Sequence, residues 1–248
     1  MKIEERLKKK YLYSKGKNLP KLFYFFFQFL KSKFKSRKFY SNWGIDLLIK
    51  DILKKKKKGI YIDVGCHHPL INNNTNILYE NGWRGINIDL DFNSIDMFNY
   101  FRPKDFNVDV ALSNKEGFTN LYFFHNRAAK NTINKSRGKG AKSIKSIKIN
   151  TLNNIIKNCK FKINNIDFLS IDVEGNELNV LKGLNFNKYK PKIIAIEFIK
   201  PNVKEFYQHN IKDILKSDIY KFMINKRYKL ANWIHDDLVF ISTTSSKL

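Results

Sequence analysis

Three stretches of this chain share one pattern, in which a short apolar run stops at a carboxylate or just beyond one. The stretches are Ile60–Gly65 (Ile-Tyr-Ile-Asp-Val-Gly), Gly85–Asp89 (Gly-Ile-Asn-Ile-Asp) and Phe168–Asp172 (Phe-Leu-Ser-Ile-Asp). Short apolar runs bounded by turn residues are typical of buried parallel strands. The carboxyl ends of parallel strands meet at one edge of a sheet, where open α/β sheets bind their ligands. The sequence therefore predicts an α/β fold with acids gathered at that edge.

Five acids belong to this expected cluster: Asp63, Asp89, Asp172, Glu174 and Glu197. Asp89 follows Asp63 by 26 residues, about the length of one strand–helix–strand unit. Rossmann-like folds hold ribose hydroxyls at the end of the second strand, because a carboxylate can accept two hydrogen bonds from a diol. Taken alone, the Asp-x-Gly turn after the first run fits an ordinary strand–turn equally well.

The stretches between these strands predict further elements. Helices are expected to begin within 71–79 and to span 91–101, and strands to span 106–112 and 117–124. Residues 126–145 hold five Lys, two Arg and two Gly without periodicity. We expect a mobile basic loop without secondary structure there, facing a polar or anionic substrate; a surface loop without a role is an equal alternative.

The net charge of +25 is a weak guide to the partner of this chain. Forty of the 47 basic residues are Lys, whereas nucleic-acid recognition favours Arg. The chain also contains 30 Asn and only six Ala, a bias that A/T-rich codons produce. A nucleic-acid partner is therefore the less favoured expectation.

Residues 1–58 form a distinct segment, with 19 basic residues against four acids. We expect a basic, aromatic-rich helical extension, followed by a main domain over 59–248. Basic residues flank the aromatic run 22–30, a pattern that suits a helix lying on an anionic membrane surface. The favoured alternative is that the helically spaced apolar side chains of this run pack on the main domain. These are Phe23, Phe26, Phe27 and Leu30.

Several features favour a cytoplasmic protein, in peripheral contact with a membrane if the extension binds one. Cys66 and Cys159 follow no metal-ligand spacing, which favours a reduced compartment. No apolar run approaches the length of a membrane span, and the first residues lack the pattern of a signal peptide.

The motifs resemble the FkbM family of methyltransferases over roughly residues 59–241. The resemblance rests on Tyr61–Gly65, Gly82–Asp89, Ala111–Ser113, Asp167–Gly175 and Leu181–Leu184. It implies the class I S-adenosylmethionine-dependent fold, a Rossmann-like α/β structure with helices on both faces of a mostly parallel seven-stranded sheet. The last pair of strands, here 227–232 and 238–241, would be antiparallel.

The resemblance also implies a cofactor site. Asp63, Gly65 and Cys66 would line the methionine end of S-adenosylmethionine, and Asp89 would hold the ribose. Asp109 and Ala111 would flank the adenine. Thr75, at the start of the first expected helix, completes the expected cofactor-binding set.

Methyl transfer to a hydroxyl needs a base that accepts the hydroxyl proton. Asp172 and Glu174 are the candidates, with His67 or His68 as alternatives because imidazole titrates nearest neutral pH. The histidines could equally contact substrate or a metal, and Glu174 could instead stabilise a helix N-terminus. Asp172 and Glu197 could contribute to a Mg²⁺ site, although the sequence shows no obligatory metal cage.

By this resemblance the chain is expected to be an O-methyltransferase acting on a sugar hydroxyl of a glycan, glycolipid or nucleotide sugar. One alternative is an RNA ribose 2′-O-methyltransferase whose basic segments grip phosphates. Another is a non-catalytic module that docks on membranes or RNA.

Overall fold

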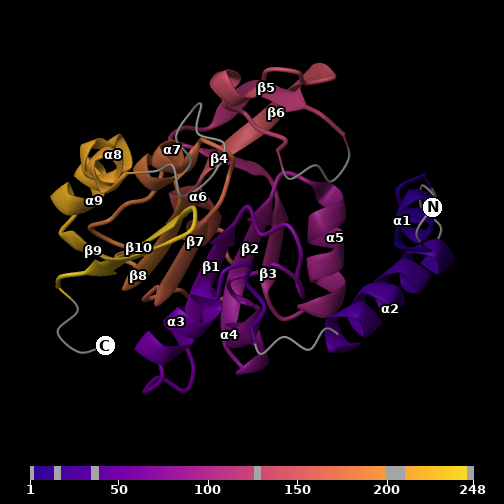
Figure 1. Cartoon of the computed structure of the whole chain (residues 1–248), viewed down its shortest axis with the longest axis horizontal. Helices are drawn as coiled ribbons and strands as arrows, with labels where there is room; N and C mark the ends of the chain where they lie inside the picture. Colours follow the sequence, from indigo (N-terminus) through magenta and orange to yellow (C-terminus); the bar gives the residue numbers. More distant parts are fainter. Residues whose placement is uncertain (1–2, 14–17, 35–38, 126–129, 199–209, 245–248) are drawn as a thin grey trace.

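The computed structural model describes residues 3–13, 18–34, 39–125, 130–198 and 210–244. Its centre is a seven-stranded sheet in which neighbouring strands come from distant parts of the chain (Figure 1). In spatial order the strands are β3 (Phe106–Asp109), β2 (Arg84–Asp89), β1 (Ile60–Val64), β7 (Phe168–Ile171), β8 (Ile193–Glu197), β10 (Asp237–Ser242) and β9 (Tyr228–Ile234). The first five run parallel, and β10 is antiparallel to both of its neighbours. The predicted Rossmann-like sheet is confirmed.

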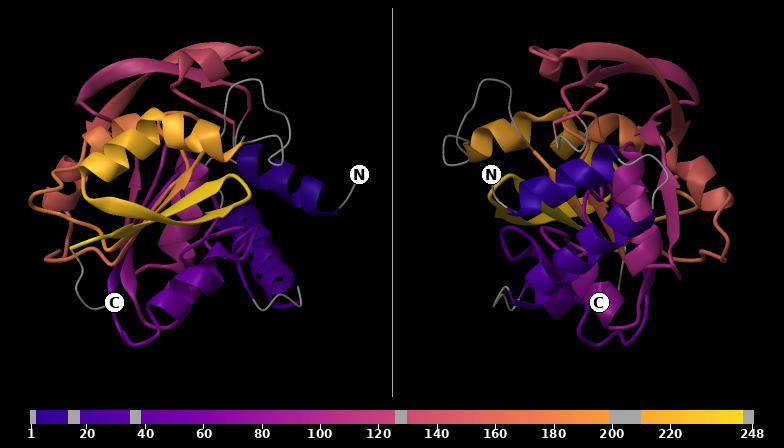
Figure 2. Two further views of the ribbon diagram at one scale, coloured as in Figure 1. Left: turned by 60° about the vertical axis from the view of Figure 1, so that its left-hand side comes forward. Right: turned by 90° about the vertical axis from the view of Figure 1, so that its right-hand side faces the viewer.

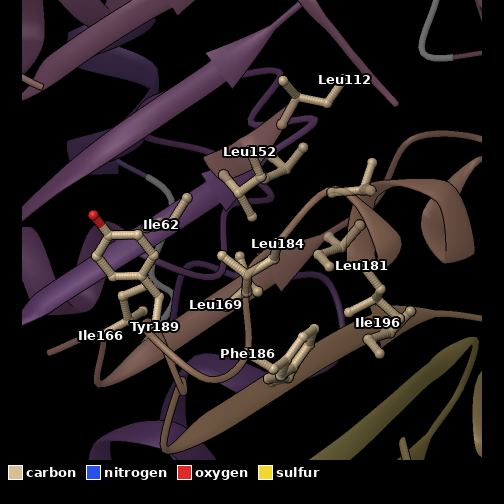
Figure 3. Packing of buried hydrophobic residues seen from close by; sticks show 14 of the residues in the cluster. Ile62, Leu112, Leu152, Ile166, Leu169, Leu181, Leu184, Phe186, Tyr189 and Ile196 are labelled. Carbon is tan, nitrogen blue, oxygen red and sulfur yellow. The ribbon is translucent and has the colours of Figure 1, made fainter. Parts of the chain in front are cut away.

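Helices cover both faces of this sheet, because the strands alternate their side chains between two cores (Figure 2). Ile62 and Leu169 face the larger core, part of which Figure 3 shows, whereas Tyr61 and Phe168 face the smaller one. The larger core includes residues of α6 (Leu152–Lys157), α7 (Glu177–Lys182), α8 (Ile211–Lys216) and α9 (Asp218–Asn225). The smaller core includes residues of α3 (Ile45–Ile52) and α4 (Asn76–Glu80), while α5 (Phe92–Phe101) packs along β2 and β3.

A second sheet lies beside the first, with the order β4 (Ala111–Ser113), β6 (Ser143–Thr151) and β5 (Gly117–Phe123). The single strand expected over 106–112 is therefore two strands. The amide of Val110 donates to the Asp89 carbonyl at 2.8 Å, where β3 ends its pairing with β2. Beyond that point the chain leaves the main sheet and pairs with β6.

The expectation that 126–145 lacks secondary structure is wrong for its described part. A 3₁₀ helix, η1, spans Lys135–Arg137, and β6 begins at Ser143. Thr132 forms an isolated bridge with Tyr122. Residues 126–129 lie outside the described residues, and the mobility of the segment stays a prediction. The pairing partner of this segment, β5, was recognisable in the sequence, but its own lysine-rich strand was not.

The N-terminal segment is helical, as α1 (Ile3–Tyr13) and α2 (Asn18–Phe34), followed by α3. The first two helices pack against each other and on α5 through Tyr11, Tyr24, Phe25 and Met97. In contrast, Ile45 and Ile49 of α3 belong to the smaller core of the main sheet. The 1–58 segment is therefore divided: α1 and α2 pack on α5, whereas Tyr40 and α3 pack against the smaller core of the main sheet.

The aromatic run of α2 faces solvent more than expected. Phe23 and Phe26 are exposed, so the expectation that they pack on the main domain is wrong. Tyr24 and Phe25 take the inward side instead. None of the described helices is long and apolar enough to cross a bilayer.

Candidate active site

The predicted convergence of acids is confirmed by the strand order. β2, β1, β7 and β8 are consecutive and parallel, so their carboxyl ends share one edge. Asp89 and Glu197 end β2 and β8, Asp63 is the last residue but one of β1, and Asp172 directly follows β7. Glu174 lies two residues further along. One edge of the sheet therefore carries all five carboxylates.

A cavity of about 250 Å³ opens at this edge. Six of the predicted site residues line it: Gly65, His67, Asp89, Ala111, Asp172 and Glu174. Apolar walls come from strand ends and their flanks, at Val64, Ile88, Leu90, Val110, Leu112 and Val173. Further lining comes from Asn42, Asn72, Asp91, Asn131, Ile133 and Asn176. The cavity therefore pairs an apolar wall with carboxylates and amides, the usual composition of a small-molecule site.

Gly65 brings the ends of β1 and β7 together at the floor of the cavity. Its backbone is left-handed, with φ of 77°, and a Cβ at this position would overlap the carbonyl oxygen of Asp172. Only glycine fits both the conformation and the approach. The next turn is held by Asp89, whose Oδ2 accepts from the His67 amide and whose Oδ1 accepts from the Asp91 amide, each at 2.8 Å.

Backbone strain is concentrated at this cavity. His67, Asn72 and Glu174 line it, and they have positive φ values of 47°, 53° and 58°. Such conformations cost of order 1–3 kcal/mol for residues with side chains, and they collect at binding and catalytic sites. Three backbones in this conformation therefore border one cavity, which marks it as a candidate binding or catalytic site.

Asp63 and Thr75 lie beneath the cavity rather than on its wall. Asp63 Oδ2 accepts from the Thr75 hydroxyl at 2.7 Å and from Asn73 Nδ2 at 2.9 Å. Burial raises the pKa of Asp63, while Thr75 and Arg102 oppose that rise. The Thr75 hydroxyl is thus used by Asp63 and does not cap α4. Both residues shape the β1 loop and have no surface on the cavity.

Arg102 is the buried centre of this network, and it directly follows the helix that the sequence predicts over 91–101. Its side chain is fully buried, and it donates to Thr75 Oγ1 at 2.8 Å and to Asn73 Oδ1 at 2.9 Å. It also donates to the carbonyl of Pro69. A lone Arg before a proline gives no local signal that it will turn inward.

The two adjacent histidines have separate environments. His67 lines the cavity, whereas His68 is buried and does not. His68 Nδ1 accepts from the amides of Leu70 and Ile71, at 3.1 and 3.2 Å. The structure does not favour His68 as a base, because its ring is buried and its Nδ1 is bonded to loop amides. His67 lines the cavity, where it can contact a ligand.

Cys66 and Asp109 also lie off the cavity. Cys66 is buried against Ile95 and Phe98 of α5, and burial raises the pKa of its thiol well above the usual range. Asp109 ends β3 and is exposed. Of the expected adenine edge, only Val110 and Ala111 reach the cavity.

Arg137 links the basic segment to the acids, a contact that the sequence did not predict. Its Nη1 lies 2.7 Å from Glu174 Oε2 and 3.4 Å from Glu197 Oε2. Thr132 donates to the Glu174 carbonyl at 2.8 Å, and Asn134 donates to the Gly175 carbonyl. The described part of the segment is therefore tied to the turn after β7. Composition flags it as basic but does not show which cation turns inward.

Asp172, Glu174 and Glu197 are crowded together. One oxygen from each lies within 4.8 Å of the others. Asp172 is an exposed residue whose accessible surface opens onto both cavities, while protein atoms crowd around its carboxylate. This shielding from bulk water, followed by the charges of Glu174 and Asp237, raises its pKa well above the usual range. Burial, followed by the charges of Asp172 and Glu174, likewise raises the pKa of Glu197. Burial also raises the pKa of Glu174, against the opposing effect of Arg137.

Such a set of oxygens suits Mg²⁺ by chemistry, but a cation is already present in it. The Arg137 guanidinium bridges Glu174 and Glu197, which leaves Asp172 as the carboxylate of the three without a hydrogen-bond partner among the described residues. The positive charge of Arg137 therefore balances part of the negative charge of the three acids, and the cluster does not require a metal for that purpose. Glu177, in contrast, accepts from the amides of Val173 and Gly175 and supports the turn.

A second, more polar cavity of about 120 Å³ adjoins the first. Both are lined by Asn42, Asn72 and Asp172. The second also touches Trp43, Ile45, Asn74, Glu197, Asp236 and Asp237. Burial, followed by the charge of Asp236, raises the pKa of Asp237 to about 7. Asp172 thus stands where the two cavities meet, with an apolar-walled space on one side and an acidic, amide-rich space on the other.

Comparison with known families gives this edge its context. The model of the methyltransferase FkbM domain matches residues 63–230, which include β1 from Asp63, the turn after β7 and most of the lining of the first cavity. A search of curated proteins finds no match. The family match covers well over half of the chain. This chain is a methyltransferase and belongs to the methyltransferase FkbM domain family.

Proposed function

We propose that the protein is an S-adenosylmethionine-dependent O-methyltransferase acting on a sugar hydroxyl. The observation that carries the proposal is the position of Asp172, a crowded carboxylate of raised pKa between two adjoining cavities. One cavity suits a nucleoside cofactor, and the other suits a polar acceptor. S-adenosylmethionine, when bound, supplies a methyl group on a positively charged sulfur.

The residues of the first cavity fit a nucleoside. Asp89 lines the cavity, and although its two oxygens accept backbone N–H groups, a carboxylate has about four acceptor sites and can also accept from ribose hydroxyls. Leu90, Val110 and Ala111 offer an apolar wall to an adenine ring. At the other end, Gly65 leaves backbone without a side chain beside the methionine portion.

Asp172 is the favoured base for the acceptor hydroxyl. A raised pKa makes a carboxylate a better proton acceptor at neutral pH. Glu174 is less suited to the same role, because its pairing with Arg137 stabilises the charged form. We assign Glu174 and Arg137 to positioning, and we assign His67 to contact with bound ligand.

The second cavity supports a polyhydroxyl acceptor over RNA. Three Asn side chains and four carboxylates line it, and these groups can exchange many hydrogen bonds with sugar hydroxyls. The same acids would repel a phosphate backbone. Arg137 of the basic segment is also engaged with Glu174 and Glu197, which reduces its availability for phosphates.

The test is transfer of radiolabelled methyl from S-adenosylmethionine into separated glycans, lipids and RNA of the source cell. We expect label in glycan or glycolipid, with Asp172→Asn lowering kcat about 10²–10⁴-fold at nearly unchanged cofactor affinity. Label confined to RNA would reject the sugar acceptor. Unimpaired turnover of Asp172→Asn would reject its role as base.

Cofactor binding is tested by calorimetry with S-adenosylhomocysteine and its 2′-deoxy analogue. Asp89→Asn should weaken the parent ligand about tenfold and should abolish the discrimination between the two ligands. Asp109→Asn is the matched control, because Asp109 ends the neighbouring strand and stays off the cavity. Absence of any binding to the unaltered protein would overturn the assignment of the first cavity.

A further inference from the structure

Helix α2 exposes a continuous apolar stripe. Leu19, Leu22, Phe23, Phe26 and Phe29 are 65%, 45%, 59%, 60% and 40% exposed. Their spacing places them along one side of the helix. With about 150–250 Å² of surface for each aromatic side chain, the stripe exposes on the order of 500 Å², near the upper limit for monomeric proteins. Exposed patches of that size mark interaction surfaces.

Contacts on the opposite side of α2 fix the orientation of this stripe. Tyr24 and Phe25 are buried against Tyr11 and α5. Lys21 Nζ lies 2.7 Å from Asp96 Oδ1, and the Tyr11 hydroxyl donates to Asp96 Oδ2 at 3.0 Å. Turning the stripe inward would break the ion pair and expose two aromatic rings. The stripe is therefore presented outward by the packed structure itself.

The charge around the stripe is strongly positive. Residues 1–58 have a net charge of +15, and α2 contains three basic residues and no acid. Lys31 and Lys33 lie in its last turn, and Lys33 Nζ is 5.6 Å from the centre of the Phe29 ring. Lysines beside an apolar face can extend their ammonium groups to lipid phosphates while their stems contact the apolar layer.

We propose that α2 docks on an anionic membrane surface, with the stripe inserted at the boundary between headgroups and acyl chains. Two copies of this chain would bring like charges together if they paired through α2, which opposes self-association there. RNA fits less well, because Leu19 and Leu22 cannot stack on bases as aromatic side chains do. The membrane matches both the apolar stripe and its basic surroundings. The inference is independent of methyl transfer.

The experiment is sedimentation of the full-length protein with vesicles of phosphatidylcholine alone or with 30% phosphatidylserine, a composition chosen for the test. We expect binding to the anionic vesicles to exceed binding to neutral ones at least about tenfold and to fall with added salt. Phe23→Ser with Phe26→Ser should lower binding to anionic vesicles at least about tenfold. The matched control is Phe118→Ser, since Phe118 on β5 is 74% exposed but lies away from α2, and it should bind normally.

A second variant separates the contribution of charge. Lys31→Glu with Lys33→Glu keeps the stripe and should remove the preference for anionic vesicles. Equal vesicle binding by the Phe23/Phe26 variant and the parent would overturn the proposal. A second contrary result would be that neither the parent nor the Phe23/Phe26 variant binds vesicles, while the parent forms a dimer in light scattering or an RNA complex that the variant does not form. Unchanged thermal unfolding of the exposed-site variants verifies that they are folded.

Discussion

The turns that follow β1 and β7 lie side by side, yet they treat their carboxylates in different ways. Below the first turn, Asp63 accepts two hydrogen bonds and lies in the field of the buried Arg102. In the second turn, Asp172 is crowded by other acids, and Arg137 pairs with Glu174 and Glu197 instead. The first carboxylate maintains shape, and the second is left in a state suited to chemistry.

The largest expected effect comes from removing Arg102, the buried cation that binds the loop after β1. Arg102→Met removes the buried cation that lies near Asp63 and binds Thr75 and Asn73, and we expect a loss of about 3–5 kcal/mol in the free energy of unfolding. Urea unfolding followed by circular dichroism measures it. Arg84→Met, which alters a less buried arginine, should cost under about 1 kcal/mol. Similar losses in the two variants would contradict the role given to Arg102.

A smaller loss is expected where the two turns touch. Gly65→Ala combines a left-handed backbone with overlap on the Asp172 carbonyl, so we expect a cost of about 3 kcal/mol and a loss of ligand binding. Gly82→Ala has the same backbone requirement, with φ of 82°, but open space around the added Cβ. It should cost about 1 kcal/mol. Equal costs, measured by thermal unfolding, would show that the contact between the turns is unimportant.

Removing Arg137, which pairs with Glu174 in the turn after β7, should change the pH dependence of turnover more than it changes stability. Arg137→Gln should cost about 1 kcal/mol or less, because the ion pairs are partly solvated. The charge of Arg137 opposes the rise in the pKa of Glu174 and of Glu197, which cluster with the proposed base Asp172, so its loss should move the acidic limb of the kcat–pH profile to higher pH. Arg137→Lys should restore the limb in part. If the acidic limb stays at the same pH, Arg137 does not influence the pKa values of the acids that govern turnover.

The second cavity should make the free energy of unfolding depend on pH. Because the folded-state pKa of Asp237 is raised to about 7, the folded protein binds the extra proton, and this site stabilises less as pH rises from about 4 to about 7. Asp237→Asn should flatten the unfolding free energy over that window, by up to about 1.4 kcal/mol per pH unit. Asp218→Asn alters an exposed acid and should leave the slope unchanged. An unchanged slope in Asp237→Asn would contradict the shift.

Local sequence pattern was sufficient for the strands and for the meeting of their acids. Apolar runs ending at Asp63, Asp89, Asp172 and Glu197 place those residues at one edge whatever the side-chain packing is. The start of α5 was likewise readable, since Asp91 caps it by accepting from the Asn93 amide. Backbone pairing is repetitive, and short patterns encode it.

The partners of the acids were not readable, because they depend on contacts between distant residues. Arg102 reaches Thr75, 27 residues away, and Arg137 reaches Glu197, 60 residues away. The separate environments of His67 and His68 follow from a single left-handed residue. In α2, aromatic residues surround the helix, so periodicity did not distinguish the inward side that Asp96 and α5 select.

The two cavities differ in how much of their lining lies within the stretch that matches the family. Five of its nine lining residues, Asn42, Trp43, Ile45, Asp236 and Asp237, lie outside the stretch that matches the family, whereas the first cavity lies almost wholly within it. Substitutions in the two flanking pieces of chain can therefore reshape the second cavity without altering the turn around Gly65. A new specificity can arise at the margins of the chain while the common catalytic framework stays unchanged.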